Sequence, residues 1–505
     1  MRSTVLILIL GFLLIFGCVE ETETPEIEVP VVETPETESQ ESYVDFSDGN
    51  FSMDYPSSWT DFEKEEDEIL RTGYGNCVAI VKKQTLAPNY LKAVITEHAE
   101  QVEWKGDESE FDFSLEDGTV VHSKNKVVFC ECGSYWISVS CLKSSFDNET
   151  ADRIIDSAEC SYELPPIYTG KGKPGMIILA TEETMLDTYC PNVKRVRETG
   201  APIIHGYIAW GATEKSEDDY DWVGMDYKME ISSLHGMERS IVIDIIRTND
   251  IGDIPSDVEF TSFDDPELKE RFADFAVEVL DRYGDNISYI EIGNEVDIYL
   301  ANHRDEIDEF KELYGYTYDR IKDKHPDVKI GTVFAYHAAK KANATDIIEE
   351  ISDVGDFNAF TLYIYNENFA FNTDMDEVPE YFDEMDEISE KPFAVVETGW
   401  STSALLESSE EKQAEYVDEV FSILEEKKDR IEFLTWFGTN DIPDETCGLI
   451  AESFITEDIE HVKGTEYMKY FEAFICTEGL RTIENEPKPG WNEWIKKTKE
   501  YTGIE

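Results

Sequence analysis

Basic residues are scarce in this chain of 505 residues. It has 43 Lys and Arg against 111 Asp and Glu, which gives a formal net charge of -68 at pH 7. A surface this negative repels nucleic acids, so we exclude a nucleic-acid partner. Acidic polysaccharides would be repelled in the same way. A simpler interpretation, in which the charge only keeps the protein soluble, stays open.

Two further absences concern cofactors. No glycine-rich phosphate loop follows any predicted strand, which disfavours an open, doubly wound nucleotide-binding sheet. Cys130 and Cys132 stand two residues apart on a predicted strand, but no His or Cys at metal-ligand spacing accompanies them. We therefore predict no metal site and no cofactor. Disulfide pairing among the cysteines cannot be read from the sequence.

Long hydrophobic runs are also rare, and the N-terminus has the clearest one, at residues 4–17. It is too short and wrongly flanked for a typical membrane span, and it predicts an export signal over residues 1–18. Ile15-Phe16-Gly17-Cys18 resembles a lipoprotein processing box, in which Cys18 becomes lipid-modified. An uncleaved signal anchor is the alternative. We expect the protein on the extracellular face of the cell membrane, lipid-anchored or secreted.

A segment of unusual composition follows. Residues 19–42 read VEETETPEIEVPVVETPETESQES. Like charges and prolines keep such a segment extended, so we predict a disordered acidic linker.

Residues 43–165 have the short β-type runs of a small α+β domain. The predicted strands are 51–54, 76–83, 91–97, 119–129 and 135–142, with a closing helix at 148–159. Gly133-Ser134 between the last two strands predicts a hairpin. The phrase FSMDYPSSW at 51–59 resembles the opening strand of small domains of the photosystem PsbP type. A role as a spacer or protein-contact module and a glycan-binding role both stay open.

From residue 166 to residue 505, buried strands alternate with amphipathic helices. The predicted strands are 176–180, 202–210, 240–246, 288–293, 329–335, 359–365, 393–397 and 432–438. The predicted helices are 184–199, 222–236, 265–284, 303–324, 343–351, 376–388, 409–428 and 463–475. Eight continuous apolar strands alternating with helices imply a parallel sheet closed into a (βα)₈ TIM barrel.

Carboxylates stand at the ends of two of these strands. The fourth strand ends in Asn294-Glu295, and the seventh ends in Glu397. The carboxyl ends of barrel strands meet at the active rim, and three strand steps place these two residues across the opening from one another. Two facing carboxylates can cleave a glycosidic bond, because one donates a proton while the other attacks the anomeric carbon or activates water.

Further motifs make this pattern more specific. They are Gly200-Ala201, Trp210, Tyr220-Asp221-Trp222 with Asp226, Arg282-Tyr283-Gly284, Ile321-Lys322 with Pro326, Glu397-Thr398-Gly399-Trp400-Ser401, Gln413-Ala414, Trp436 and Gly448-Leu449. By their order and spacing, residues 175–475 resemble the clan A glycoside hydrolases. That resemblance implies retaining (βα)₈ enzymes, with the acid/base in an Asn-Glu pair ending strand 4 and the nucleophile in a Glu ending strand 7.

The resemblance implies a role for each matching residue. Glu295 would be the acid/base with a raised pKa, and Glu397 the nucleophile, kept ionised by hydrogen bonds. Asn294 would donate to the sugar 2-hydroxyl. Tyr365 would hydrogen-bond Glu397, with Tyr363 as the alternative.

Further substrate contacts are expected from Trp436, Trp400 and Trp210, each offering a flat apolar face to a sugar. Arg247 could replace an Arg that many members carry near strand 2.

The sequence departs from the family pattern at two places that affect the substrate. Val296 replaces the common Pro, and Tyr363 stands where many relatives have His. We expect cleavage of β-linked, neutral glycans with retention. As alternatives, Asn294 and Glu295 could merely bracket a helix start, or the barrel could be an inactive glycan-binding or scaffold lipoprotein.

Overall fold

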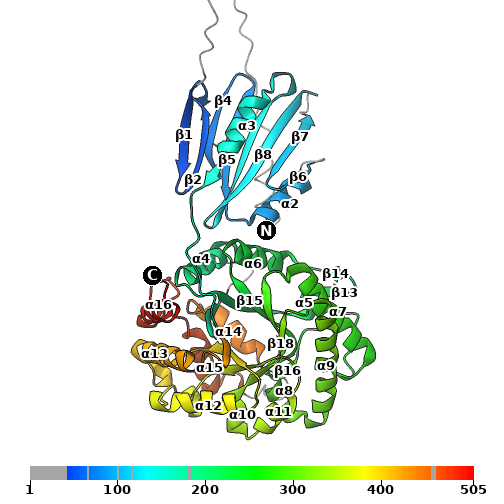
Figure 1. The fold of residues 1–505 in the computed structure, drawn as a ribbon, viewed down its shortest axis with the longest axis vertical. Coiled ribbons are helices and arrows are strands. Elements are labelled where there is room, and N and C mark those ends of the chain that lie inside the picture. Colours follow the sequence, from blue (N-terminus) through cyan, green and yellow to red (C-terminus); the bar gives the residue numbers. More distant parts are fainter. Residues whose placement is uncertain are drawn as a thin grey trace, which may run out of the picture. The chain divides into compact units, whose positions relative to one another are not determined.

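The computed structural model describes residues 42–64, 67–98, 102–114, 118–179, 185–455 and 462–504. The predicted export signal, Cys18 and all but the last residue of the predicted linker lie outside these ranges. Within the described ranges, no helix is long and apolar enough to cross a membrane. The chain divides into two compact units between Glu163 and Leu164 (Figure 1).

The N-terminal unit is an α+β domain with two antiparallel sheets. Its strands are β1 (Tyr43–Asp48), β2 (Phe51–Pro56), β3 (Thr60–Asp61), β4 (Glu68–Tyr74), β5 (Cys77–Gln84), β6 (Trp104–Lys105), β7 (Glu108–Ser114), β8 (Val120–Cys130), β9 (Gly133–Leu142) and β10 (Glu159–Cys160). The sheet orders are β1-β2-β10 and β3-β4-β5-β9-β8-β7-β6. The predicted hairpin is present, with Cys130 opposite Gly133. The likeness to the PsbP type stays a prediction.

One predicted strand of this unit is wrong. Residues 91–97 lie in helix α2 (Pro88–His98). The β-branched Val94, Ile95 and Thr96 favoured a strand, but Leu91 and Ile95 are the buried positions. That four-residue spacing places both on one face of a helix, and burial of this face outweighs local propensity.

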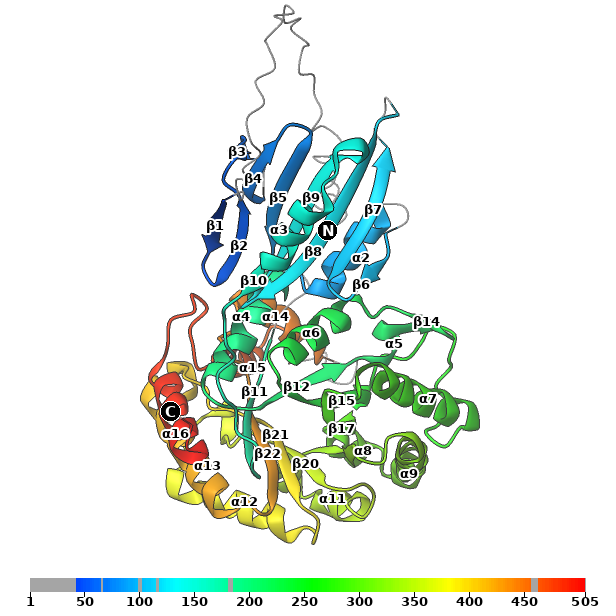
Figure 2. The ribbon, with the colours of Figure 1, turned by 45° about the horizontal axis from the view of Figure 1, so that its top comes forward.

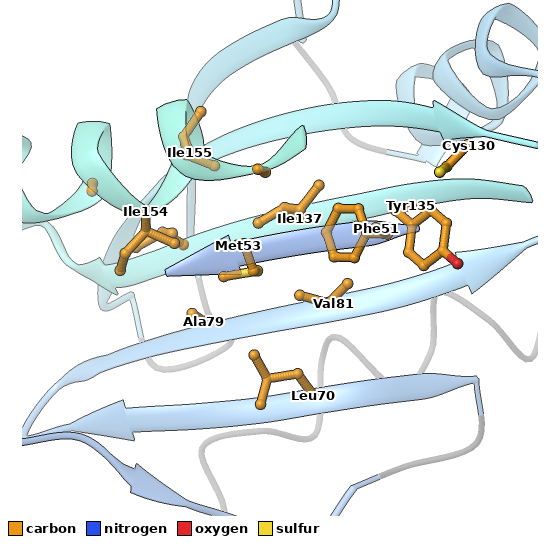
Figure 3. Packing of buried hydrophobic residues seen from close by; sticks show 13 residues of the cluster. Phe51, Met53, Leu70, Ala79, Val81, Cys130, Tyr135, Ile137, Ile154 and Ile155 are labelled. Carbon is orange, nitrogen blue, oxygen red and sulfur yellow. The ribbon is translucent and has the colours of Figure 1, made fainter. Parts of the chain in front are cut away.

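The core of the N-terminal unit lies between β2, helix α3 (Asn148–Ser157) and the larger sheet (Figure 3). Phe51 of β2 stacks on Tyr135 of β9 with ring centroids 4.2 Å apart. Ile154 and Ile155 of α3 point into the same cluster. Two disulfides, Cys77–Cys141 and Cys130–Cys160, link strands of this unit. A small domain with a limited core gains stability from such links.

The C-terminal unit is a parallel (βα)₈ barrel, as the sequence predicts (Figure 2). Its strands are β11 (Lys173–Ile177), β12 (Ile203–Ile208), β15 (Glu238–Arg247), β17 (Ile287–Asn294), β18 (Lys329–Gly331) with β19 (Val333–Ala335), β20 (Asn358–Leu362), β21 (Phe393–Thr398) and β22 (Ile431–Trp436). The hydrogen-bonded path runs from β18 to β19. Because only Thr332 separates these two segments, they form one strand, and the sheet closes on itself.

Helices follow the barrel strands, and some of them are short helices within the loops that connect strands to the outer helices. They are α4 (Met185–Glu198), α5 (Trp210–Thr213), α6 (Val223–Leu234), α7 (Pro266–Tyr283), α8 (Val296–Asn302), α9 (Ile307–Lys324), α10 (Tyr336–Ala342), α11 (Thr345–Ile351), α12 (Val378–Glu387), α13 (Glu410–Glu426), α14 (Asp444–Ser453), α15 (Glu466–Cys476) and α16 (Pro489–Thr502). The loops also contain short 3-10 helices, which are η2 (Arg304–Glu306), η3 (Glu367–Phe369), η4 (Met375–Glu377) and η5 (Ala404–Leu406). Strands β13 (Glu214–Ser216) and β14 (Asp219–Tyr220) form a hairpin, and the short strand β16 (Asp250–Ile251) pairs with the end of β15.

The last helix of the barrel is not the predicted one. Residues 463–475 do contain α15, but its side chains line the cavity described below. Helix α16 packs beside α13 instead: Trp494 contacts Phe421 with ring centroids 5.0 Å apart, and it lies 6.3 Å from the ring of Trp436. The signal for α16 was Pro489 in the first turn, followed by Trp491 and Trp494 on one face.

Candidate active site

A cavity of about 590 Å³ lies at the carboxyl ends of the barrel strands. The strand ends contribute a group of polar side chains to it. These are Tyr207 on β12, Asn294 at the end of β17 with Glu295 directly after it, Tyr363 directly after β20, and Glu397 on β21. The barrel therefore brings the two predicted catalytic carboxylates to one cavity. The cavity size suits a ligand as large as a short oligosaccharide or a glycoside with a sizeable aglycone.

Glu295 has an unusual backbone conformation. It sits between β17 and α8 with φ 51° and ψ 44°, the left-handed region that non-glycine residues rarely adopt. Although it occupies the N-cap position of α8, its side chain makes no capping hydrogen bond. Glu295 therefore does stand at a helix start, but its side chain is not used to cap that helix. Strain of this kind is typical of functional sites.

Two hydroxyl groups hold the Glu295 carboxylate over the cavity. Thr361 Oγ1 donates to Oε1 at 2.6 Å, and Thr248 Oγ1 donates to Oε2 at 2.7 Å. The backbone N–H of Thr248 also donates to the carbonyl of Asn294 at 2.9 Å. The end of β15 thus fixes the Asn294-Glu295 pair from one side, and the end of β20 fixes it from the other.

Two phenols hold the Glu397 carboxylate. Tyr207 donates to Oε1, and Tyr363 donates to Oε2 at 2.6 Å. The prediction that Tyr365 binds Glu397 is wrong. The ring of Tyr365 packs against Phe369 and Phe474, and its carbonyl accepts from His337 at 2.8 Å. β20 ends at Leu362, and Tyr363 continues the alternation that brings Thr361 to the site. Tyr365 also lines the cavity, but it makes no hydrogen bond to Glu397, which Tyr207 and Tyr363 hold.

The two carboxylates influence each other electrostatically. Burial raises the pKa of Glu295 above its ordinary value. Burial, and next the negative charge of Glu295, raise the pKa of Glu397 to about 7, while the hydrogen bonds from Tyr207 and Tyr363 act in the opposite direction. These hydrogen bonds do not outweigh burial, contrary to the expectation that they keep Glu397 ionised. Such a pair keeps one proton between its two members up to about neutral pH. One protonated and one ionised carboxyl are what glycosidic cleavage requires.

Asn294 faces the cavity with a free polar group. Its side chain is buried, and its Oδ1 has no hydrogen-bond partner among the described residues. A buried amide without a partner is costly in an empty site and gains a partner when a ligand hydroxyl arrives. The unpartnered oxygen could accept from a sugar hydroxyl, whereas the predicted contact is a donation from Asn294, which stays a prediction.

The predicted tryptophan platforms are wrong. Trp210, Trp400 and Trp436 are completely buried, and none of them lines the cavity. Each indole N–H is used inside the protein: those of Trp210 and Trp400 donate to Glu214 and Ser408 side chains, and that of Trp436 donates to the Glu478 carbonyl. Large rings near strand ends here fill the space between strands and outer helices. Arg247, in contrast, lines the cavity and is exposed.

Sequence reasoning missed four polar residues of the site: Tyr207, Thr248, Thr361 and Glu478. The signal for Tyr207 was its inward-facing position two residues after His205. Glu478 follows α15 and is buried, with neither carboxylate oxygen hydrogen-bonded among the described residues. Burial raises the pKa of Glu478 well above its ordinary value, and the charge of Glu397 adds to this. Burial thus favours the neutral form of Glu478 beside the site.

Metal ligands do not gather at this cavity. Over the described ranges, its carboxylates are not grouped closely enough to share one metal ion. His205, inside β12, is bound to Ser240 at 2.9 Å and is an interior polar group.

No protein-family model and no curated protein sequence match this chain. Solved structures do resemble it, among them two GH5_18 proteins. A GH5_18 from Bifidobacterium longum subsp. longum has a TM-score of 0.50 and 14% identity, and a GH5_18 from Bifidobacterium longum subsp. infantis has a TM-score of 0.50 and 12% identity. Each likeness covers 66% of this chain and 80% of the other chain. The shared fold is the (βα)₈ barrel.

Proposed function

We propose that the C-terminal unit is a retaining glycoside hydrolase that cleaves β-linked, neutral glycans. The observation that carries this proposal is the placement of Glu295 and Glu397 on one cavity with electrostatically coupled charges. The fold shared with the two GH5_18 structures and the matching family motifs support it. An inactive glycan-binding barrel is the rival, but a binder needs neither the strained Glu295 nor the shared proton.

The proposed reaction has two balanced steps. The Glu397 carboxylate attacks the anomeric carbon while Glu295 gives its proton to the departing oxygen, leaving a glycosyl ester on Glu397. Glu295, now ionised, removes a proton from water, which attacks the same carbon and frees Glu397. Tyr207 and Tyr363 orient the nucleophile, and Thr248 and Thr361 orient the acid/base.

A panel of p-nitrophenyl β-glycosides tests this function. We expect the full chain to hydrolyse at least one member and to release the sugar first as the β-anomer, which NMR distinguishes. Binding of sugars without turnover of any substrate would favour the rival. Initial release of the α-anomer would reject the retaining mechanism.

The phenol of Tyr363 gives a sharper test of the site. Tyr363→Phe removes one donor to a charged acceptor, so we expect kcat/KM to fall by about 10- to 100-fold. The lost hydrogen bond lowered the pKa of Glu397, so the acid limb of the pH–rate profile should move to higher pH. Tyr365→Phe is the matched control, because its hydroxyl does not reach Glu397, and its profile should keep the wild-type limbs. An equal shift in both variants would remove Tyr363 from this role.

We also propose that the protein is exported and anchored to the outer face of the membrane through a lipid on Cys18. The support is the sequence of residues 1–18, a hydrophobic run ending in a processing-type box. We expect Cys18→Ser to move the protein from the membrane fraction to the medium or the soluble fraction. An unchanged membrane association would favour an uncleaved signal anchor instead.

A further inference from the structure

The cavity has two chemically different sides. Polar side chains come from the ends of β12, β15, β17, β20 and β21, as described above. The segment that follows β22 contributes a second, mostly apolar part of the lining. Its lining residues are Phe437, Ile450, Ala451, Phe454, Ile455, Val462, Tyr467, Met468, Phe471, Phe474, Ile475 and Glu478, of which Tyr467 and Glu478 carry polar side-chain groups.

This apolar wall is built on a helical pair that is tied together. Helices α14 and α15 pack against each other, and the Cys447–Cys476 disulfide joins α14 to the last residue of α15. Phe454 and Phe471 contact each other edge to face at 5.6 Å, and Phe369 of η3 stacks on Phe474. The two helices that carry the wall are thus held together by packing and by a disulfide. Apolar side chains that they do not bury against each other line the cavity.

A second sugar unit is a poor fit to this wall. Each sugar hydroxyl loses water on entering a cavity and needs a hydrogen-bond partner there. The aliphatic side chains Ile450, Ile455 and Val462 offer none. The phenyl rings of Phe454, Phe471 and Phe474 offer no conventional hydrogen-bond partner either, although a ring can cover one face of a sugar. An alkyl chain, in contrast, gains free energy for each methylene that it moves from water onto such a surface.

The carboxylate pair lies where the two sides meet. Tyr363, which donates to Glu397, packs its ring edge to face on Phe474 at 5.2 Å and on Phe437 at 6.0 Å. The wall also reaches the side of the acid/base: Asn249 donates to the Phe454 carbonyl at 3.3 Å, and the neighbouring Thr248 donates to Glu295. A glycoside whose departing oxygen faces Glu295 therefore has its leaving group near this wall.

We propose that the leaving group of the substrate is a long alkyl chain, so that the barrel cleaves amphiphilic β-glycosides with the chemistry of glycolipids. This inference rests on the proposed function. It agrees with the anchor proposed for Cys18, which would hold the barrel close to a membrane that contains such molecules.

The test compares leaving groups of different length on one sugar. The substrates are methyl, octyl and dodecyl β-D-glucosides, galactosides and mannosides, used with the full chain below the concentrations at which micelles form. Each methylene buried favours binding about fourfold, so we expect kcat/KM to rise by at least about 30-fold from methyl to octyl. A flat or falling series, with p-nitrophenyl glycosides still cleaved, would overturn the inference and leave the proposed function intact.

Turnover of no glycoside would instead count against the proposed function. Calorimetric binding of the same alkyl series to the wild-type chain then decides the inference separately. Tighter binding of octyl than of methyl glycosides supports the apolar subsite, and equal or absent binding rejects it.

Two neighbouring residues of α14 provide a matched pair of variants. Ile450 lines the cavity, whereas Leu449 points away from it and is 67% exposed. We expect Ile450→Asn to lower the octyl-to-methyl ratio of kcat/KM by about tenfold. Leu449→Asn should leave that ratio unchanged. Equal effects of the two substitutions would show that the wall does not contact the leaving group.

Discussion

Glu397→Ala is expected to lower kcat/KM for a cleaved β-glycoside by at least about 10⁴-fold, because the residue that bonds to the sugar is lost. The fold should persist, since the freed hydroxyls of Tyr207 and Tyr363 face a cavity that water can enter. Steady-state kinetics measures the loss, and circular dichroism checks the fold. Glu390→Ala, at an exposed position on the same barrel, is the control and should retain full activity.

Chemical rescue separates a nucleophile from a residue that merely shapes the site. In Glu397→Ala, azide fits the space left by the carboxylate and attacks the face of the sugar that Glu397 attacked. The expected product is therefore the α-glycosyl azide, which NMR identifies. Rescue that gives the β-azide, or activity that persists without azide, would contradict the assignment of Glu397.

The architecture was predictable from the sequence because strands buried on both faces alternate regularly with amphipathic helices. All eight predicted barrel strands are present, and the carboxyl ends of the fourth and seventh had to meet at one rim. The prediction of a strand at 91–97 was wrong because it relied on local β-propensity. That propensity does not show that Leu91 and Ile95 lie on the same face of a helix and are buried together. Helix α16 was not predicted because the alternation of strands and helices requires one helix after the eighth strand. The sequence analysis assigned that position to residues 463–475, which contain the cavity-lining helix α15.

Side-chain directions at the site were harder to predict than its location. Tyr363 and Tyr365 both follow β20, and which of them meets Glu397 depends on where the chain leaves the strand. The tryptophans have the same ambiguity, because a ring near a strand end can face the cavity or the outer helices. Glu478 lies beyond the last strand and reaches the site only through the fold: a Cβ on Gly399 would come within 2.3 Å of its Oε2, so Gly399 permits the approach.

Glu295→Gln is expected to lower kcat/KM by about 10²- to 10⁴-fold for alkyl glycosides, whose departing oxygen needs a proton. Glutamine has the same shape. Its oxygen can accept from one of Thr248 and Thr361, and its NH2 can donate to the hydroxyl oxygen of the other, so the site should stay in place. For 2,4-dinitrophenyl glycosides, whose leaving group departs without a proton, formation of the glycosyl ester should be far less impaired. Pre-steady-state release of dinitrophenol measures that step, and an equal loss with both leaving groups would argue against an acid role.

The pH dependence of Glu295→Gln follows from the coupling between the two carboxylates. In the wild-type chain, burial and the charge of Glu295 raise the pKa of Glu397 to about 7, and kcat/KM should fall as pH rises through that region, because the pair loses its last proton. Glutamine removes both the acid and the neighbouring charge. The alkaline limb should therefore disappear for dinitrophenyl glycosides, and the pKa of Glu397 should drop, which moves the acid limb to lower pH. An alkaline limb that survives the substitution would mean that another group donates the proton. Glu478, a buried carboxyl whose pKa is raised by burial and by the charge of Glu397, would be the next residue to replace.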